Sequence, residues 1–154
     1  LQKIQRLAWE VYENNYQEKE LVVIGVKERG KVVADLLCSQ LEEISELNIH
    51  KAYLQLDESQ PLNSVFENLD IEILGKTVIL VDDVLNTGKT LMLASVPILL
   101  QNPLGLQTVI LANRDHKKFA ISADYVGISL ATTLHEHLSF EKNERDEYAV
   151  SLGE

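Results

Sequence analysis

The sequence predicts an α/β fold in which helices flank both faces of a mostly parallel sheet. Continuous apolar, β-branched runs at 21–26, 77–81 and 107–112 are typical of strands that are covered on both faces. Segments with helical spacing separate these runs, and strand–helix–strand alternation is the pattern of parallel sheets. Such sheets bind ligands at the carboxyl ends of their strands. The residues that follow the first two runs are therefore the first candidates for a functional site.

The helices are predicted by apolar residues that recur at i, i+3 and i+4 spacing. This spacing runs through residues 2–16 and 31–47. A third helix is predicted over 90–100, before Asn102-Pro103. No repeat or linker interrupts the 154 residues, so we expect one domain, 1–154.

The remaining segments are predicted to be loops and weaker strands. Lys27–Gly30 breaks the first strand, and residues 57–70 are polar and aperiodic, which predicts a long loop. Further strands are predicted at 51–56, 124–130 and 148–152.

The composition limits the partners and the compartment. The 24 Asp and Glu residues against 14 Lys and Arg give a net charge of −10, which disfavours RNA as a partner because phosphate contacts need basic residues. The single cysteine, Cys38, allows no internal disulfide and favours a reducing, cytoplasmic compartment. No apolar run reaches the roughly 20 residues that span a bilayer, so no membrane partner is expected.

Two adjacent carboxylates, Asp82 and Asp83, follow the buried run at 77–81. Adjacent carboxylates repel each other and resist burial, so they need a cationic or hydrogen-bond-donating partner. Ribose hydroxyls and magnesium-bound waters are such partners. Asp82 and Asp83 are therefore predicted to meet ribose hydroxyls or the waters of a bound Mg²⁺.

A phosphate-binding loop is predicted directly after this pair, at Thr87–Thr90. It opens a helix, whose N-terminus presents backbone N–H groups and partial positive charge. Thr87 and Thr90 add hydroxyl donors, and Gly88 allows close approach. A P-loop is excluded, because that motif needs an earlier glycine near Asp83. An ordinary polar turn before a capped helix is the alternative interpretation.

The whole stretch resembles the phosphoribosyl pyrophosphate (PRPP) motif of type I phosphoribosyltransferases: apolar residues, Asp-Asp, an apolar residue, two variable positions and Thr-Gly-x-Thr. The resemblance implies the fold of that family, with a small C-terminal hood formed largely by 113–154. It implies that Asp82 and Asp83 hold the ribose 2- and 3-hydroxyls. The residues implied to bind the 5-phosphate are Asn86, Thr87, Gly88, Lys89 and Thr90.

The end of the first strand resembles the family's pyrophosphate loop. The implied PRPP-binding residues there are Lys27, Glu28, Arg29 and Gly30. Arg29 can grip pyrophosphate in a bidentate way and take the leaving charge, which places it with Asp82 and Asp83 among the implied catalytic residues. A cis peptide bond near Lys27–Glu28 is also implied. An ordinary β-turn with exposed charges is the alternative.

The C-terminal third resembles the pyrimidine-operon attenuation regulators, which also have uracil phosphoribosyltransferase activity. The segments that carry this resemblance are Ala112–Lys118 and Ala123–Gly127. It implies PRPP and a nucleobase or nucleotide as ligands, uracil as the base, and a homodimer. In the hood, the Tyr125 ring would stack on the base and the Val126 backbone would read its edge. Taken alone, Tyr125 is a half-buried strand aromatic.

Two departures from the family pattern leave two functions open. Asn86 stands where purine salvage enzymes carry Asp, and an amide cannot accept a proton, so hypoxanthine and guanine are weaker substrates. The segment 52–75, where the family has a basic flexible loop, contains five acids and no Lys or Arg. Such a lid should repel PRPP unless it acts by excluding water. We therefore expect a phosphoribosyltransferase or a PRPP- or nucleotide-sensing regulator with weak or no catalysis.

Overall fold

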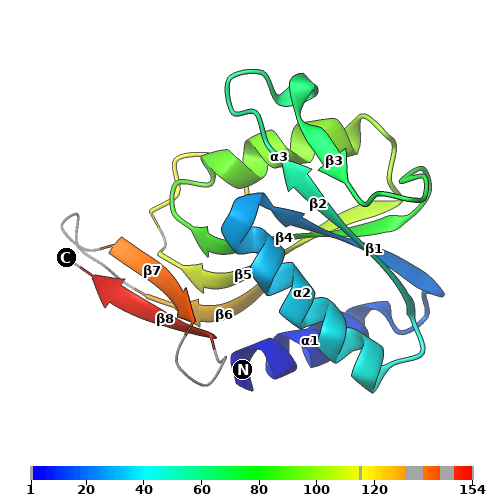
Figure 1. The fold of residues 1–154 in the computed structure, drawn as a ribbon, viewed down its shortest axis with the longest axis horizontal. Helices are drawn as coiled ribbons and strands as arrows, with labels where there is room; N and C mark the ends of the chain where they lie inside the picture. Colours follow the sequence, from blue (N-terminus) through cyan, green and yellow to red (C-terminus); the bar gives the residue numbers. More distant parts are fainter. Residues whose placement is uncertain (1, 115, 131–136, 143–147, 154) are drawn as a thin grey trace.

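The computed structural model describes residues 2–114, 116–130, 137–142 and 148–153 (Figure 1). Six strands form one sheet in the order β3-β2-β1-β4-β5-β6. Their bounds are β1 Glu20–Val26, β2 Asn48–Gln55, β3 Val65–Glu67, β4 Thr77–Leu85, β5 Gly105–Asn113 and β6 Tyr125–Ser129. The helices are α1 Gln2–Asn15, α2 Lys27–Ile44, the short 3-10 helix η1 Pro61–Asn63 and α3 Lys89–Leu99. A second, antiparallel sheet pairs β7 His137–Lys142 with β8 Tyr148–Gly153.

The main sheet is mostly parallel, which confirms the predicted fold class. Strands β2, β1, β4, β5 and β6 pair in parallel with their neighbours, and β3 pairs antiparallel with β2 at the edge. Because β1 and β4 are parallel neighbours, their carboxyl ends meet at the same edge of the sheet. The segments at 27–30 and 82–90 are thereby brought together.

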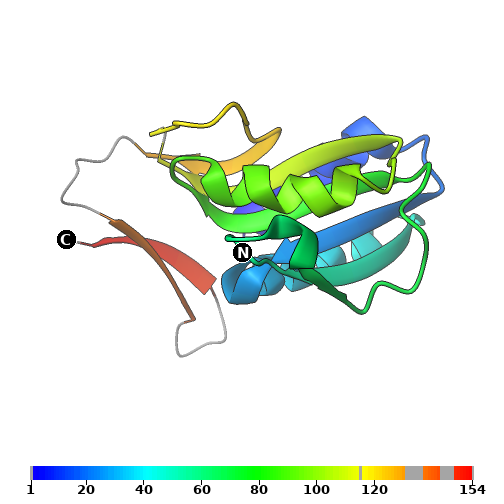
Figure 2. The same ribbon diagram turned by 90° about the horizontal axis from the view of Figure 1, so that it is seen from above.

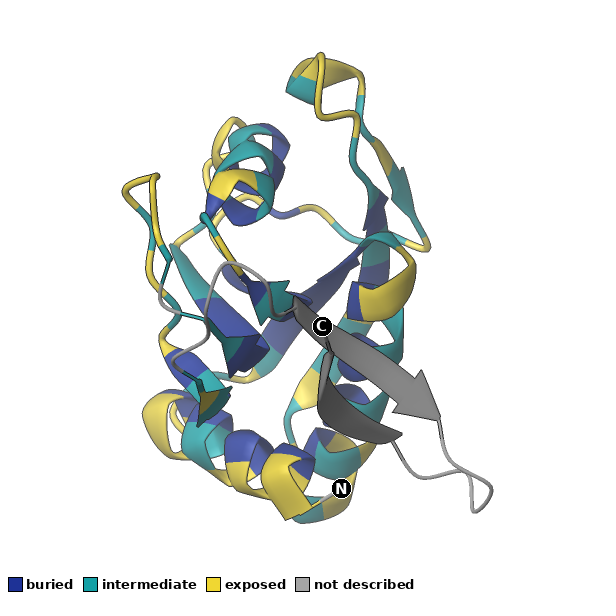
Figure 3. Cartoon of the chain, turned by 90° about the vertical axis from the view of Figure 1, so that its left-hand side faces the viewer, coloured by how far each residue is buried: buried dark blue, intermediate teal, exposed yellow. Residues whose placement is uncertain are grey.

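A buried apolar layer lies on each face of the sheet. On one face, α1 and α2 pack on residues such as Val23 and Ile79. On the other face, α3 packs on residues such as Val22 and Leu80. This division follows the two-residue period of a strand. Figure 2 shows α3 and α2 on opposite sides of the sheet, and Figure 3 shows that the central strands are largely buried.

Helix α2 begins at Lys27, directly after β1, so the predicted break at Lys27–Gly30 is the first turn of a helix. Lys27 makes this change of direction with a φ of 55°, a left-handed conformation that is uncommon for a residue with a side chain. The Lys27–Glu28 peptide bond is trans, so the implied cis peptide is wrong. One positive-φ residue replaces the expected loop.

Strand β4 continues through the acidic pair to Leu85, instead of ending before it. The reason is that the ladder with β5 continues, and Asp82 and Val84 are opposite Ile110 and Ala112. The backbone of the acidic pair is therefore held in the sheet by its pairing with β5. Carboxylates are rare in such positions, and for this reason the residue types predicted an earlier end.

The edges of the structure differ most from the prediction. Residues 57–70 contain η1 and β3, whose three residues are too few for an alternating pattern. Strand β6 joins the main sheet beside β5, so Asp124–Gly127 does not lie in a separate hood. Strand β7 is not among the predicted strands, and the predicted hood residues 131–136 and 143–147 lie outside the described part. Within the described residues, none of the helices has the length and apolar character needed to cross a membrane.

Candidate active site

A cavity of about 480 Å³ opens where the carboxyl ends of β1 and β4 meet. Its lining residues are Lys27, Glu28, Arg29, Asp82, Asp83, Val84, Asn86 and Thr90. All of them except Val84 were predicted as site residues from the two motifs. The predicted residues outside the lining are Gly30, Thr87, Gly88 and Lys89 in the two motifs, and Tyr125 and Val126.

Gly30 supports the site from behind, because it lets the first turn of α2 lie against β4. A Cβ atom at Gly30 would be 2.8 Å from the Val81 carbonyl oxygen and 3.3 Å from Asp82 Oδ1. These distances leave no room for a side chain. Gly30 therefore fixes the spacing between the two halves of the cavity.

The acidic pair is nearly buried, with exposed fractions of 7% for Asp82 and 8% for Asp83. Asp82 Oδ1 accepts a hydrogen bond from the Asp83 N–H at 2.8 Å, and Asp83 Oδ1 accepts one from the Val84 N–H at 2.8 Å. Arg29 Nη1 lies 3.8 Å from Asp83 Oδ2. Burial, reinforced by the charge of Asp83, raises the pKa of Asp82 well above its usual value.

The donor set of this pair fits Mg²⁺, which prefers carboxylate, water and substrate oxygens. Both carboxylates border the cavity. Among the described residues, no group of three His, Cys, Asp or Glu side chains could hold a metal ion. A metal at Asp82 and Asp83 would thus need oxygens from a ligand or from water, as the sequence predicts.

The loop predicted to bind phosphate leads into α3, as the sequence indicates, and Gly88 precedes the helix with a φ of 91°. A second segment holds this loop from outside. The Lys118 and Phe119 N–H groups donate to the Thr87 carbonyl at 2.8 and 3.1 Å. A Cβ atom at Gly88 would be 2.9 Å from Ile121 Cγ2. The segment 118–121 therefore stabilises the loop, and no local pattern in the sequence indicates this contact.

Glu58 lies beside the two motifs, although the sequence marks it only as one of five acids in 52–75. Its Oε1 atom is 2.9 Å from Lys27 Nζ and accepts a hydrogen bond from Thr90 Oγ1 at 3.1 Å. The hydrogen bond from Lys27, and then that from Thr90, lowers the pKa of Glu58 below its usual value. This residue joins the two halves of the cavity and has no motif that could have revealed it.

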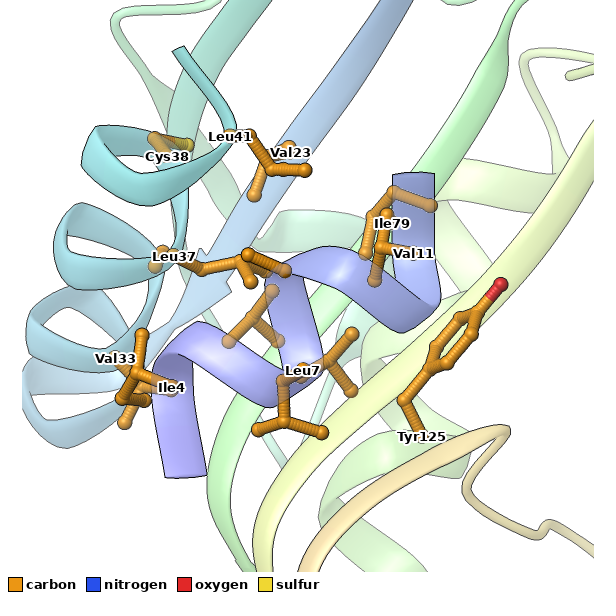
Figure 4. Packing of buried hydrophobic residues seen from close by; sticks show 14 of the residues in the cluster. Ile4, Leu7, Val11, Val23, Val33, Leu37, Cys38, Leu41, Ile79 and Tyr125 are labelled. Atoms are coloured by element: carbon orange, nitrogen blue, oxygen red, sulfur yellow. The ribbon is translucent and has the colours of Figure 1, made fainter. Parts of the chain in front are cut away.

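The predicted base-stacking role of Tyr125 is wrong. Its ring is 6% exposed and packs in the core beneath α1, near Leu7 and Val11 (Figure 4). The Tyr125 hydroxyl donates to Gln107 Oε1 at 2.7 Å. A ring enclosed in this way cannot stack on a ligand. Tyr125 is a strand aromatic, as it suggests by itself, but it is buried and not half-buried.

Val126 likewise lies on β6, away from the cavity. Its carbonyl oxygen accepts a hydrogen bond from Arg6 Nη2 at 2.8 Å, and the same nitrogen donates to the Gly127 carbonyl at 2.6 Å. Arg6 thus covers the outer edge of β6. The Val126 carbonyl is thus engaged by Arg6, and Val126 does not line the cavity.

At the sheet edge where β1 and β4 end, the paired carboxylates and the loop before α3 follow β4, and Lys27 and Arg29 follow β1. This is the arrangement that the sequence predicts for a protein of the phosphoribosyltransferase class. The phosphoribosyl transferase domain family matches residues 1–145, and the chain belongs to this family. The predicted resemblance is thereby confirmed.

Within this family, the chain is similar to proteins that are named for the regulation of a pyrimidine operon. The pyrimidine operon regulatory protein of Lactococcus lactis subsp. lactis is 36% identical over 148 residues, which cover 93% of this chain and 85% of that protein. The bifunctional protein pyrR of Enterococcus faecalis is 32% identical over 151 residues, covering 92% and 84%. The likeness to pyrimidine-operon regulators that the sequence predicts is confirmed.

Solved structures agree on the fold. The hypoxanthine phosphoribosyltransferase of Trypanosoma cruzi aligns with a TM-score of 0.73 at 20% identity, over 84% of this chain and 75% of that chain. The hypoxanthine-guanine phosphoribosyltransferase of Bacillus anthracis aligns with a TM-score of 0.66 at 24% identity, over the same shares. At such identities the likeness shows the type I phosphoribosyltransferase fold and does not identify the base.

Proposed function

We propose that this protein transfers the phosphoribosyl group from PRPP to a nucleobase, with uracil as the first candidate. One observation carries the proposal. The cavity brings Lys27 and Arg29 from the end of β1 together with four residues from β4 and the segment after it, which are Asp82, Asp83, Asn86 and Thr90. This set offers cations for a pyrophosphate, carboxylates for a diol and a helix N-terminus for a phosphate.

The transfer breaks the bond from ribose C1 to a pyrophosphate oxygen and forms a bond from C1 to a base nitrogen, whose proton is released to water. Asp82 and Asp83 accept hydrogen bonds from the ribose hydroxyls and orient the ring. Arg29 and Lys27 stabilise the negative charge that gathers on the departing pyrophosphate. Asn86 through Thr90 hold the 5-phosphate, so that C1 faces the base.

Mg²⁺ fits the carboxylate pair, and Asp82 and Asp83 would hold it through ribose hydroxyls or water. When bound, the ion neutralises charge on the pyrophosphate. The preference for uracil draws support from Asn86, which borders the cavity as an amide, and from relatives named for a pyrimidine operon. A homodimer and a cytoplasmic location belong to the same proposal.

A base-by-base assay tests this function. The full chain is incubated with PRPP, Mg²⁺ and each of uracil, hypoxanthine, guanine and adenine, and the nucleotide product is measured. We expect UMP as the main product and none from the Asp83→Asn variant. Absence of product with every base, at protein concentrations that bind PRPP, would contradict the proposal.

A PRPP- or nucleotide-sensing regulator is the second candidate, and Glu58 favours it. The acidic side chain contacts two residues that PRPP would use, Lys27 and Thr90. Calorimetry that detects PRPP or UMP binding without turnover would support this function. Salt-dependent binding to the leader RNA of a pyrimidine gene, which the net charge of −10 disfavours, would extend it to RNA.

A further inference from the structure

Glu58 places a carboxylate among the side chains that the two motifs provide for phosphates. Lys27 belongs to the first strand end and Thr90 to the phosphate-binding loop, and both contact the same oxygen, Glu58 Oε1. Lys89, another predicted phosphate ligand, also stabilises the charge of Glu58. A carboxylate oxygen that meets an ammonium group and a hydroxyl in this way occupies the contacts of a phosphate oxygen.

The turn that presents Glu58 is built by its neighbours. Asp57 Oδ1 accepts hydrogen bonds from the Ser59 and Gln60 N–H groups, both at 3.0 Å. The Asp57 N–H donates to Ser64 Oγ at 2.9 Å, which closes the turn. Such a side-chain turn orients the residue beside it. This turn holds Glu58 beside the lining residues Lys27 and Thr90.

The other acids of 52–75 do not share this position. Glu67 pairs at 3.1 Å with Lys31, which is not a lining residue, whereas both partners of Glu58 line the cavity. Glu72 is exposed and lies in the loop that joins β3 to β4. The negative charge of the whole segment and the specific contact of Glu58 could each weaken PRPP binding. Because only Glu58 makes the contact, an experiment can separate these two effects.

We propose that Glu58 is an internal competitor for the phosphate site, which PRPP must displace from Lys27 and Thr90 before it binds. The proposal rests on the proposed function and adds a residue that sets its ligand affinity. Displacement releases an ion pair that is about half exposed, with side-chain exposures of 44% for Lys27 and 45% for Glu58. Such pairs are weak, so we expect a change in Kd of about two- to fivefold.

Titration calorimetry of the full chain with PRPP and Mg²⁺ tests the proposal on three proteins: the unmodified chain, Glu58→Gln and Glu72→Gln. Glu72→Gln removes the same charge from the same segment without touching the cavity. We expect the Kd for PRPP to fall about two- to fivefold in Glu58→Gln and to stay unchanged in Glu72→Gln. Equal affinity in all three, or weaker binding by Glu58→Gln, would overturn the proposal. An equal gain in both variants would do so too, because general charge would then be responsible.

Amide hydrogen exchange separates this inference from the proposed function. Without ligand, Glu58→Gln should exchange faster than the unmodified chain over residues 57–64, and Glu72→Gln should not. If no protein binds PRPP, the proposed function fails and the exchange result decides whether Glu58 holds the segment on the site. Unchanged exchange over 57–64 in Glu58→Gln would refute the contact itself.

Discussion

Arg29 Nη1 lies 3.8 Å from Asp83 Oδ2, across the cavity between the ends of β1 and β4. The distance is at the long end for an ion pair, and the Arg29 side chain is 55% exposed. The guanidinium is thus free to turn toward a ligand while the carboxylate stays in place. This relationship joins the two halves of the proposed active site.

The first prediction concerns Arg29. Arg29→Gln should lower kcat/KM for PRPP by about 10- to 100-fold, which is less than the loss of an enclosed donor because the side chain is half exposed. Arg29→Lys should recover part of the rate, because it keeps the charge and loses the fork that grips two phosphate oxygens. Steady-state kinetics at saturating uracil measures both. Full activity of Arg29→Gln would show that Arg29 does not contribute to the reaction.

The second prediction concerns Asp82, whose raised pKa means that the folded state binds the proton more tightly than the unfolded state. Folding stability should therefore decrease as the pH rises from the usual aspartate value of 3.8 through the raised pKa. Asp82→Asn should be more stable than the unmodified chain at pH 7 and should lose PRPP binding.

Urea unfolding at pH 7 and pH 5 checks this sign, because the advantage of Asp82→Asn should shrink at the lower pH. If Asp82→Asn is less stable than the unmodified chain at pH 7, the charged Asp82 carboxylate is stabilised in the folded state, contrary to the prediction. Sites that bind ligands often give up stability in this way.

The third prediction concerns Gly30. A methyl group there would meet the Val81 carbonyl at 2.8 Å, so Gly30→Ala should cost about 1–3 kcal/mol of unfolding free energy. Gly105→Ala is the matched control, since a Cβ atom at Gly105 would meet nothing within 4 Å. Chemical denaturation of both variants gives the comparison. Equal stabilities would mean that α2 can move away from β4 without loss.

The fourth prediction separates packing from base binding at Tyr125. Tyr125→Phe removes the hydrogen bond to Gln107 Oε1, which Asn15 Nδ2 shares at 2.9 Å, and should cost about 0.5–1.5 kcal/mol of stability. The KM for uracil should stay the same. Tyr16→Phe, at an exposed residue, should change neither quantity. A raised KM for uracil in Tyr125→Phe alone would show that Tyr125 contacts the base.

Much of the fold and all of the cavity lining except Val84 could be predicted because their signals are local. Buried parallel strands need continuous apolar runs, which the sequence shows directly. The acidic pair and Thr-Gly-Lys-Thr lie within nine residues of one another, so the motif can be recognised from the sequence alone. The register of β1 against β4 then brings Lys27 and Asp83 to one sheet edge. The predicted start of α2 and the predicted end of β4 were less accurate. The chain turns into α2 at Lys27 with a positive φ, and the pairing with β5 extends β4 to Leu85.

The amino-acid sequence by itself determined the class of fold, the acidic pair at the end of a buried strand and the loop that leads into α3, since each depends on residues that are neighbours in the chain. Only the tertiary structure decided that Glu58 contacts Lys27, 31 residues away, and that Tyr125 turns into the core. The physical reason is that an exposed acid and a strand aromatic have many possible partners. Which partner they meet depends on the packing of segments that lie far apart in sequence.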